Sequence, residues 1–130
     1  MAINAGLWTV TDMVPKIVET NGDLDVHGMA QYFEEVHRAE SVEVVRFLRK
    51  FVAGTRVRDL QNLADRWNEL SALDSERASA RARKDQKDFD RTTAEFLRVG
   101  VAVKDFKNAK TGEITTTWEV RTATPSKGDQ

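Results

Sequence analysis

The residue types that most often carry catalysis or bind metals are sparse in this sequence. It has no cysteine, and its two histidines, His27 and His37, fall on one predicted helix. Glu34 and His37 have the Glu-x-x-His spacing of carboxylate-bridged metal sites, but such sites need that motif twice together with further carboxylates. We therefore expect no metal site, and we interpret the histidines as surface or cap residues.

Other catalytic patterns are also missing. The chain has neither a glycine-rich phosphate loop nor a Gly-x-Ser-x-Gly elbow. Its acid pairs, such as Glu34 with Glu35 and Asp88 with Asp90, lie in hydrophilic stretches, unlike the apolar settings of catalytic carboxylic acids. We interpret them as solvated faces and expect a non-enzymatic protein without catalytic residues or cofactors.

The distribution of charge is more informative than the total. The chain has 20 Lys+Arg against 21 Asp+Glu, a net charge of −1. Residues 1–75 carry 8 basic against 12 acidic side chains, whereas residues 76–130 carry 12 against 9. The largest local excess of positive charge lies in residues 76–87. An acidic first half and a basic second half are expected to face different partners.

Length and composition predict one compact, soluble domain. A chain of 130 residues with 40% hydrophobic residues can bury one core. No apolar run approaches the roughly 18 residues that span a membrane, and the first residues have no basic leader. The lack of cysteine fits a reducing compartment, so we expect a cytoplasmic protein without a membrane partner.

The spacing of apolar residues predicts a mainly α (α+β) fold, in which a helical domain is closed by a C-terminal β-hairpin. A single domain is expected over residues 1–121, with a disordered tail at 122–130 and a short strand or docking arm at 1–10. Residues 74–88 are expected to form a solvated helix or a mobile segment. Helices are predicted over residues 11–20, 25–38, 41–53 and 56–73 and up to about Arg98, and strands over residues 99–103 and 114–120 around a turn at 108–112.

The second half of the chain resembles the winged helix-turn-helix superfamily. The stretch Phe96-Leu97-Arg98-Val99-Gly100-Val101-Ala102-Val103 is similar to the end of a recognition helix that enters a first wing strand. Residues 110–120, Lys-Thr-Gly-Glu-Ile-Thr-Thr-Thr-Trp-Glu-Val, are similar to a wing tip and its return strand. The resemblance covers residues 41–121, so the helices predicted within residues 11–38 would be additional N-terminal elements. The sequence departs from the family in one respect: the Ala/Arg-rich segment separates the second helix from the recognition helix.

This resemblance implies a small DNA-binding transcription regulator that works as a homodimer. The basic helix would supply phosphate contacts and bidentate guanine contacts, and the lysines of the hairpin would flank the backbone or the minor groove. The implied nucleic-acid-binding residues are Arg77, Arg81, Arg83, Lys84, Lys87, Arg91, Lys104, Lys107 and Lys110.

Two alternatives stay open from the sequence. The Ala/Arg/Lys/Asp run is also compatible with a solvated helix that binds nothing. The acidic residues between Glu19 and Glu43 would suit a protein-binding adaptor or inhibitor with a basic partner, and this use fits the near-neutral total charge. Trp67 and Trp118 are expected in the core, whereas Trp8 is expected either in local packing or in a dimer contact.

Overall fold

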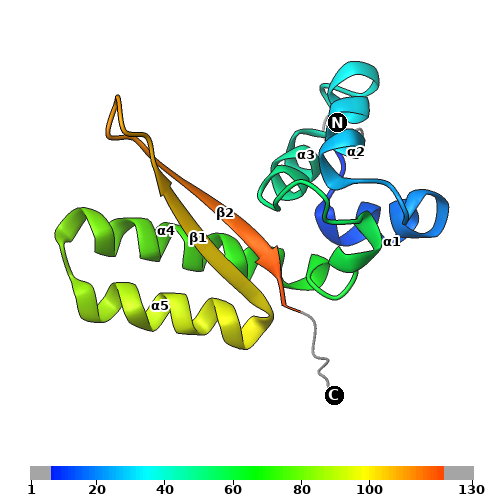
Figure 1. Ribbon diagram of the computed structural model, residues 1–130. Coiled ribbons are helices and arrows are strands. Elements are labelled where there is room, and N and C mark those ends of the chain that lie inside the picture. Colours follow the sequence, from blue (N-terminus) through cyan, green and yellow to red (C-terminus); the bar gives the residue numbers. More distant parts are fainter. Residues whose placement is uncertain (1–6, 122–130) are drawn as a thin grey trace, which may run out of the picture. The chain divides into compact units, whose positions relative to one another are not determined.

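The computed structural model describes residues 7–121 (Figure 1). Its internal contacts divide the chain into two compact units, Met1–Trp67 and Asn68–Gln130, which we call unit 1 and unit 2 and describe separately. The expectation of a single domain over residues 1–121 stays a prediction. The predicted tail at 122–130 and the first six residues of the predicted arm lie outside the described residues.

Unit 1 contains three helices whose starts are set by local side chains. The Oγ1 atom of Thr9 accepts a hydrogen bond from the Asp12 N–H, and Asp25 accepts from the His27 and Gly28 N–H groups, as expected for N-cap residues. Ser41, which precedes the third helix, makes no such capping bond and donates its hydroxyl to the Phe33 carbonyl. The helices are α1 (Val10–Asn21), α2 (Val26–Val36) and α3 (Val42–Arg49).

The helix predicted over residues 56–73 is wrong in its first half. The chain there forms two short 3₁₀ turns, η2 (Val57–Leu60) and η3 (Ala64–Arg66), with hydrogen bonds between residues three apart. Val57, Leu60 and Leu63 are buried and are spaced by three. That spacing also puts side chains in line on a 3₁₀ helix, so the apolar pattern did not separate the two structures.

Unit 2 is a helical hairpin followed by a β-hairpin. Helix α4 (Trp67–Arg83) reaches into the segment that was predicted as solvated or mobile, and α5 (Gln86–Val99) runs back in the opposite direction (Figure 1). Asp85 caps α5 by accepting from the Asp88 N–H at 3.0 Å. Gly100, with a φ of 109°, ends α5 in the left-handed conformation that glycine adopts at little cost.

The predicted β-hairpin is confirmed, although its first strand begins at Val101 and not at Val99, which ends α5; the hairpin completes the mainly helical α+β architecture. Strands β1 (Val101–Lys107) and β2 (Ile114–Val120) are antiparallel, and their register pairs Val101 with Val120 and Lys107 with Ile114. Trp118 is fully buried, and its ring centroid lies 5.3 Å from that of Phe96. Within residues 7–121, no helix combines the length and apolar character needed to cross a membrane.

Candidate nucleic-acid interface

Arg77, a predicted nucleic-acid contact, is built into the interior of unit 2. The residue is only 5% exposed, and it continues the buried positions Leu70 and Leu73 along α4. Its Nε donates to the Thr93 hydroxyl at 2.7 Å, and its two Nη atoms donate to the two carboxylate oxygens of Asp105 at 3.0 and 2.7 Å. The guanidinium therefore joins α4 to α5 and β1 through all three of its nitrogens.

Arg81 extends the same contact one turn later. Its Nη2 donates to Asp105 at 2.6 Å, and Asp105 also accepts from the Thr116 hydroxyl at 2.7 Å. The guanidinium carbons of Arg77 and Arg81 lie 4.2 and 5.4 Å from the centre of the Phe89 ring, in cation–π geometry. We call these residues, with Thr93, the Arg77–Asp105 clasp. Hydrogen bonding to Arg77, with help from Thr116 and Arg81, holds the pKa of Asp105 well below its usual range.

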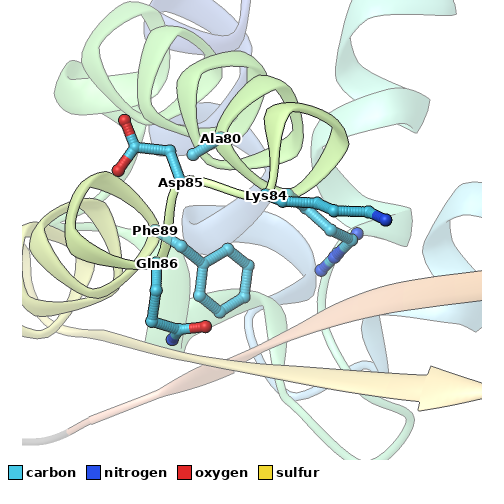
Figure 2. Close-up of a pocket in the computed structure, with 6 residues that line it drawn as sticks. Ala80, Lys84, Asp85, Gln86 and Phe89 are labelled. Carbon is cyan, nitrogen blue, oxygen red and sulfur yellow. The ribbon is translucent and has the colours of Figure 1, made fainter.

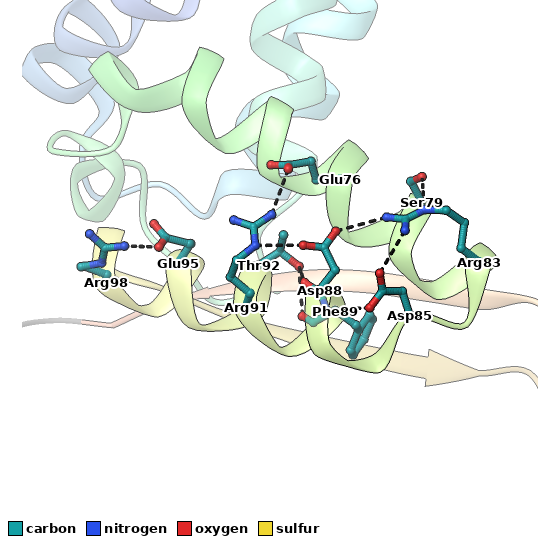
Figure 3. A network of polar contacts seen from close by, with 10 residues as sticks. All are labelled: Glu76, Ser79, Arg83, Asp85, Asp88, Phe89, Arg91, Thr92, Glu95 and Arg98. Atoms are coloured by element: carbon teal, nitrogen blue, oxygen red, sulfur yellow. Dashed lines mark hydrogen bonds and ion pairs between the residues drawn. The ribbon is translucent and has the colours of Figure 1, made fainter.

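Arg83 and Arg91 belong to an exposed ion-pair network (Figure 3). Arg91 bonds Asp88 and Glu76, each at 2.9 Å, and Arg83 bonds Asp85 and Asp88, each at 3.1 Å. The hydrogen bond from Arg91 is the main cause that lowers the pKa of Asp88, and the same bond raises the pKa of Arg91. Both arginines are thus largely neutralised by acids of their own helical hairpin.

The lysines differ from the arginines. Lys104 lies on β1 and reaches Glu119 at 3.6 Å. The other four predicted lysines are exposed, and within residues 7–121 none of them has an acidic partner. We call this group the cationic end of unit 2, and it consists of Lys84, Lys87, Lys107 and Lys110.

These four lysines lie at the same end of unit 2. Helix α4 runs through Arg77 and Arg81 to the turn at Lys84, while β1 passes the same two arginines at Asp105 and continues to Lys107. The α4–α5 turn and the tip of the β-hairpin therefore both lie beyond the clasp, and Figure 1 shows the turn and the tip on the same side of unit 2. The tip itself is ordered by Asn108, whose side chain accepts from the Lys110 and Thr111 N–H groups.

The α4–α5 turn holds a lysine in an unusual backbone conformation. Lys84 has a φ of 60°, in the left-handed region that is costly for residues with a Cβ. Its N–H donates to the Arg81 carbonyl, and the Asp85 N–H donates to the Ala80 carbonyl, a pairing that closes the end of a helix. A hollow of about 240 Å³ opens beside this turn. Figure 2 shows its lining, which consists of Ala80, Arg81, Lys84, Asp85, Gln86 and Phe89.

The acidic residues of unit 1 are partly used by its own fold. Glu34 pairs with Arg49, Asp23 with Arg58 at 2.6 Å, and Glu43 accepts from the Val10 N–H at 2.9 Å. Asp25 accepts from three backbone N–H groups, those of His27, Gly28 and Gly54, which lower its pKa against the opposing effect of burial. These contacts leave fewer free acids for the predicted basic partner.

The aromatic residues and histidines have local packing roles. Trp67 and Trp118 are buried, which confirms their predicted place in the core. The ring of Trp8 lies 4.8 Å from that of His37, and a ring nitrogen of His27 lies 2.7 Å from the Phe51 carbonyl oxygen. In the described part of the chain, no group of three or more histidines and acids could hold a metal ion.

The partners in the clasp were missed in the sequence, although a signal for them was present. The buried positions of α4, at residues 70, 73, 77 and 80, keep the helical spacing of three and four, so an arginine and an alanine continue the leucine stripe. Asp105 shares one face of β1 with Val101 and Val103 because side chains alternate along a strand. An acidic residue on the inward face of a strand, such as Asp105, needs a basic partner when it is buried.

Comparison with known proteins finds similarity to part of one class of enzyme. The chain is 39% identical over 80 residues to a cysteine–tRNA ligase of a Bradyrhizobium species, and 49% identical over 53 residues to that of Nitrobacter hamburgensis. These matches cover 62% and 41% of this chain but only 17% and 11% of the ligases. No family model matches the sequence, and no solved structure gives a significant match. The chain therefore spans about a sixth or less of the length of these curated relatives, and it shares a segment with them.

Proposed function

We propose that this protein is a non-enzymatic RNA-binding protein that contacts phosphates through the cationic end of unit 2. The observation that carries the proposal is the difference between the predicted basic residues: the arginines are bonded to acids of the fold, while four exposed lysines at one end have no acidic partner within residues 7–121. Free, clustered ammonium groups attract a polyanion, because they release the counterions condensed on it.

The hollow beside the α4–α5 turn supports the same use. It is smaller than the roughly 300–1,000 Å³ of sites for drug-sized ligands, so it suits one group of a longer polymer. Lys84 gives its wall a positive charge that has no acidic partner in the described part of the chain, Gln86 offers an amide, and Phe89 offers a half-buried ring. The Asp85 carboxylate in the lining is paired with Arg83. A phosphate or a base edge meets suitable partners in such a hollow.

RNA is favoured over DNA because of the shared segment. The relatives are named as ligases that act on tRNA, and a segment common to them and to this short chain suits contact with RNA. The sequence-based interpretation as a winged-helix regulator, with duplex DNA as the partner and a homodimer as the active form, uses the same lysines. It stays a prediction, and duplex DNA becomes one arm of the test.

The test is fluorescence anisotropy with a labelled RNA stem-loop and a duplex DNA of equal charge over a salt series. Two double variants, Lys84→Asn with Lys87→Gln and Lys107→Gln with Lys110→Gln, should each weaken RNA binding. Each should also reduce the slope of log affinity against log salt by about 1.4–1.8, which is two phosphate contacts. Asparagine is chosen at position 84 because it tolerates the left-handed conformation.

A matched control removes two exposed cations from unit 1, by Lys16→Gln with Arg46→Gln. This variant has the same loss of total charge, so it should bind like the unaltered protein. Equal losses in the control and in the two site variants would show that only total charge matters, which contradicts a specific site. Absence of any salt-dependent RNA binding would overturn the proposal, and binding to duplex DNA alone would favour the regulator.

A further inference from the structure

The outward face of the β-hairpin carries one large aromatic side chain. Asp105 faces α4 through the clasp, so its neighbours Lys104 and Phe106 project from the opposite face of β1. The register places Thr117 opposite Lys104 and Thr115 opposite Phe106. This outward face is therefore formed by Ala102, Lys104, Phe106, Thr115, Thr117 and Glu119. It is exposed at Lys104, Phe106 and Thr115, whereas the Thr117 hydroxyl is buried.

Phe106 is the most exposed of the large apolar side chains in the described part of the chain, at 56%. No second large apolar residue shares its face, because the other positions are small, hydroxylated or charged. A protein-docking surface of ordinary size needs a contiguous apolar patch, and this face does not supply one. A nucleobase needs only one ring face against which to stack.

The charges around Phe106 suit a polyanion. Lys107 is the next residue on the strand, with its side chain on the other face of β1, and Lys110 lies at the hairpin tip; neither has an acidic partner within residues 7–121. Lys104 shares its face, two residues before it. An exposed ring next to lysines is the combination with which proteins hold single strands, because bases stack on the ring while cations follow the phosphates.

We propose that Phe106 is a stacking platform for an unpaired base of a single-stranded RNA segment, whose phosphates are held by Lys107 and Lys110. This inference rests on the proposed RNA binding and adds a preference for unpaired nucleotides. Stacking requires a free base face, and a base inside a duplex does not offer one. The platform therefore discriminates between loops and helices of an RNA without reading its sequence.

The experiment uses the full chain and a labelled, uridine-rich single-stranded RNA of about 12 nucleotides, within the range of about 4–16 for such sites. Phe106→Ala should weaken binding to this strand by about 5- to 150-fold, the effect of losing one stacked base. Phe106→Tyr keeps the ring and should bind like the unaltered protein. Binding to a duplex RNA of the same length should change in neither variant.

Leu97→Ala is the matched control, because Leu97 is 47% exposed on α5 and lies outside the outward face. It removes a comparable exposed apolar side chain and should leave binding unchanged. Equal binding by Phe106→Ala and the unaltered protein would overturn the stacking platform and leave the proposed function standing. Failure of the unaltered protein to bind any RNA would overturn both the stacking platform and the proposed function. A loss of single-strand affinity in Phe106→Ala, with no loss in Leu97→Ala or Phe106→Tyr, would support the platform.

A second variant guards against misfolding. Phe106→Trp keeps an aromatic ring on the strand, and a stacked base should quench its fluorescence. The native residues Trp8, Trp67 and Trp118 contribute background fluorescence, and the same titration of the unaltered protein measures how far RNA quenches it. Quenching beyond that background supports stacking, whereas its absence while RNA binds overturns the platform even if Phe106→Ala does not fold.

Discussion

At the scale of single residues, Arg77 makes the most consequential contact of unit 2. Its planar guanidinium fits the Asp105 carboxylate with two parallel hydrogen bonds, and its Nε is taken by Thr93. Its side chain is 6% exposed and that of Asp105 is 28% exposed. Removing one member of such a pair leaves the other charge without its partner, which is strongly destabilising when the pair is buried.

We expect Arg77→Ala to lower the free energy of unfolding by about 3 kcal/mol, near the lower end of the range for buried pairs, because Asp105 keeps partial contact with water. The measurement is denaturant unfolding followed by circular dichroism. Arg98→Ala removes an exposed arginine that pairs with Glu95, and it should cost less than about 1 kcal/mol. Similar losses in the two variants would show that the clasp contributes no more than a surface pair.

The Asp105 carboxylate predicts a dependence of stability on pH. Its pKa is lowered in the folded protein, mainly by the hydrogen bonds from Arg77, so folding favours the ionised form. The resulting stabilisation is complete above the pKa of the unfolded chain, about 3.9, and it is lost as the pH falls below that value. Urea unfolding between pH 6 and pH 3 should therefore show a steeper loss for the unaltered protein than for Asp105→Asn. Parallel curves would contradict this assignment.

Lys84 offers a test in which stability and binding change in opposite directions. A residue with a Cβ at a φ of 60° is strained, and glycine relieves that strain at the cost of greater freedom in the unfolded chain. We expect Lys84→Gly to raise the free energy of unfolding by about 0.5–1 kcal/mol. The same variant should weaken RNA binding in the anisotropy assay, because an ammonium group is lost. A stabilised variant with unchanged affinity would remove Lys84 from the proposed interface.

At the scale of elements, strong alternation was a better guide than strong helical spacing. The β-hairpin was predicted with its turn because apolar residues fall at alternate positions in both strands, although Val99, which was counted in the first strand, belongs to α5. The segment 57–66 had regular apolar spacing but forms 3₁₀ turns, with its backbone bonded to the α1–α2 connection at Leu24 and Gly22. A hydrogen bond to a distant segment leaves no trace in local periodicity.

Helix α4 shows that side-chain type alone does not predict which positions of a helix are buried. Residues 74–83 contain only alanine as an apolar residue, so the segment was expected to be solvated or mobile. The structure extends the buried stripe through Arg77 and Ala80 instead. A buried arginine becomes acceptable only when a carboxylate meets it, and Asp105 lies 28 residues further along the chain. The sequence therefore did not separate the basic residues that belong to the fold from those that stay exposed, because that division depends on the tertiary structure.

At the scale of the whole molecule, the net charge of −1 does not show which of the candidate basic residues are paired within the fold. Nine basic residues were candidates for nucleic-acid contacts, and only the four of the cationic end have no acidic partner within residues 7–121. A salt series that reports about four phosphate contacts, and not nine, would fit this division. Whole-chain charge and local counts of arginine are both poor guides where ion pairs are made within the fold.

The short connection between α4 and α5 also sets the phase of one helix against the other. Only Lys84 and Asp85 separate the two helices, and each residue added to an α-helix turns the following side chains by about 100°. One inserted residue would rotate Phe89 and Thr93 away from Arg77. Insertions should therefore be tolerated between Asn108 and Glu113, where the residues of the hairpin tip are exposed. Insertions at the α4–α5 turn should be rejected, because the length of this turn sets the rotation of α5 that brings Phe89 and Thr93 to Arg77.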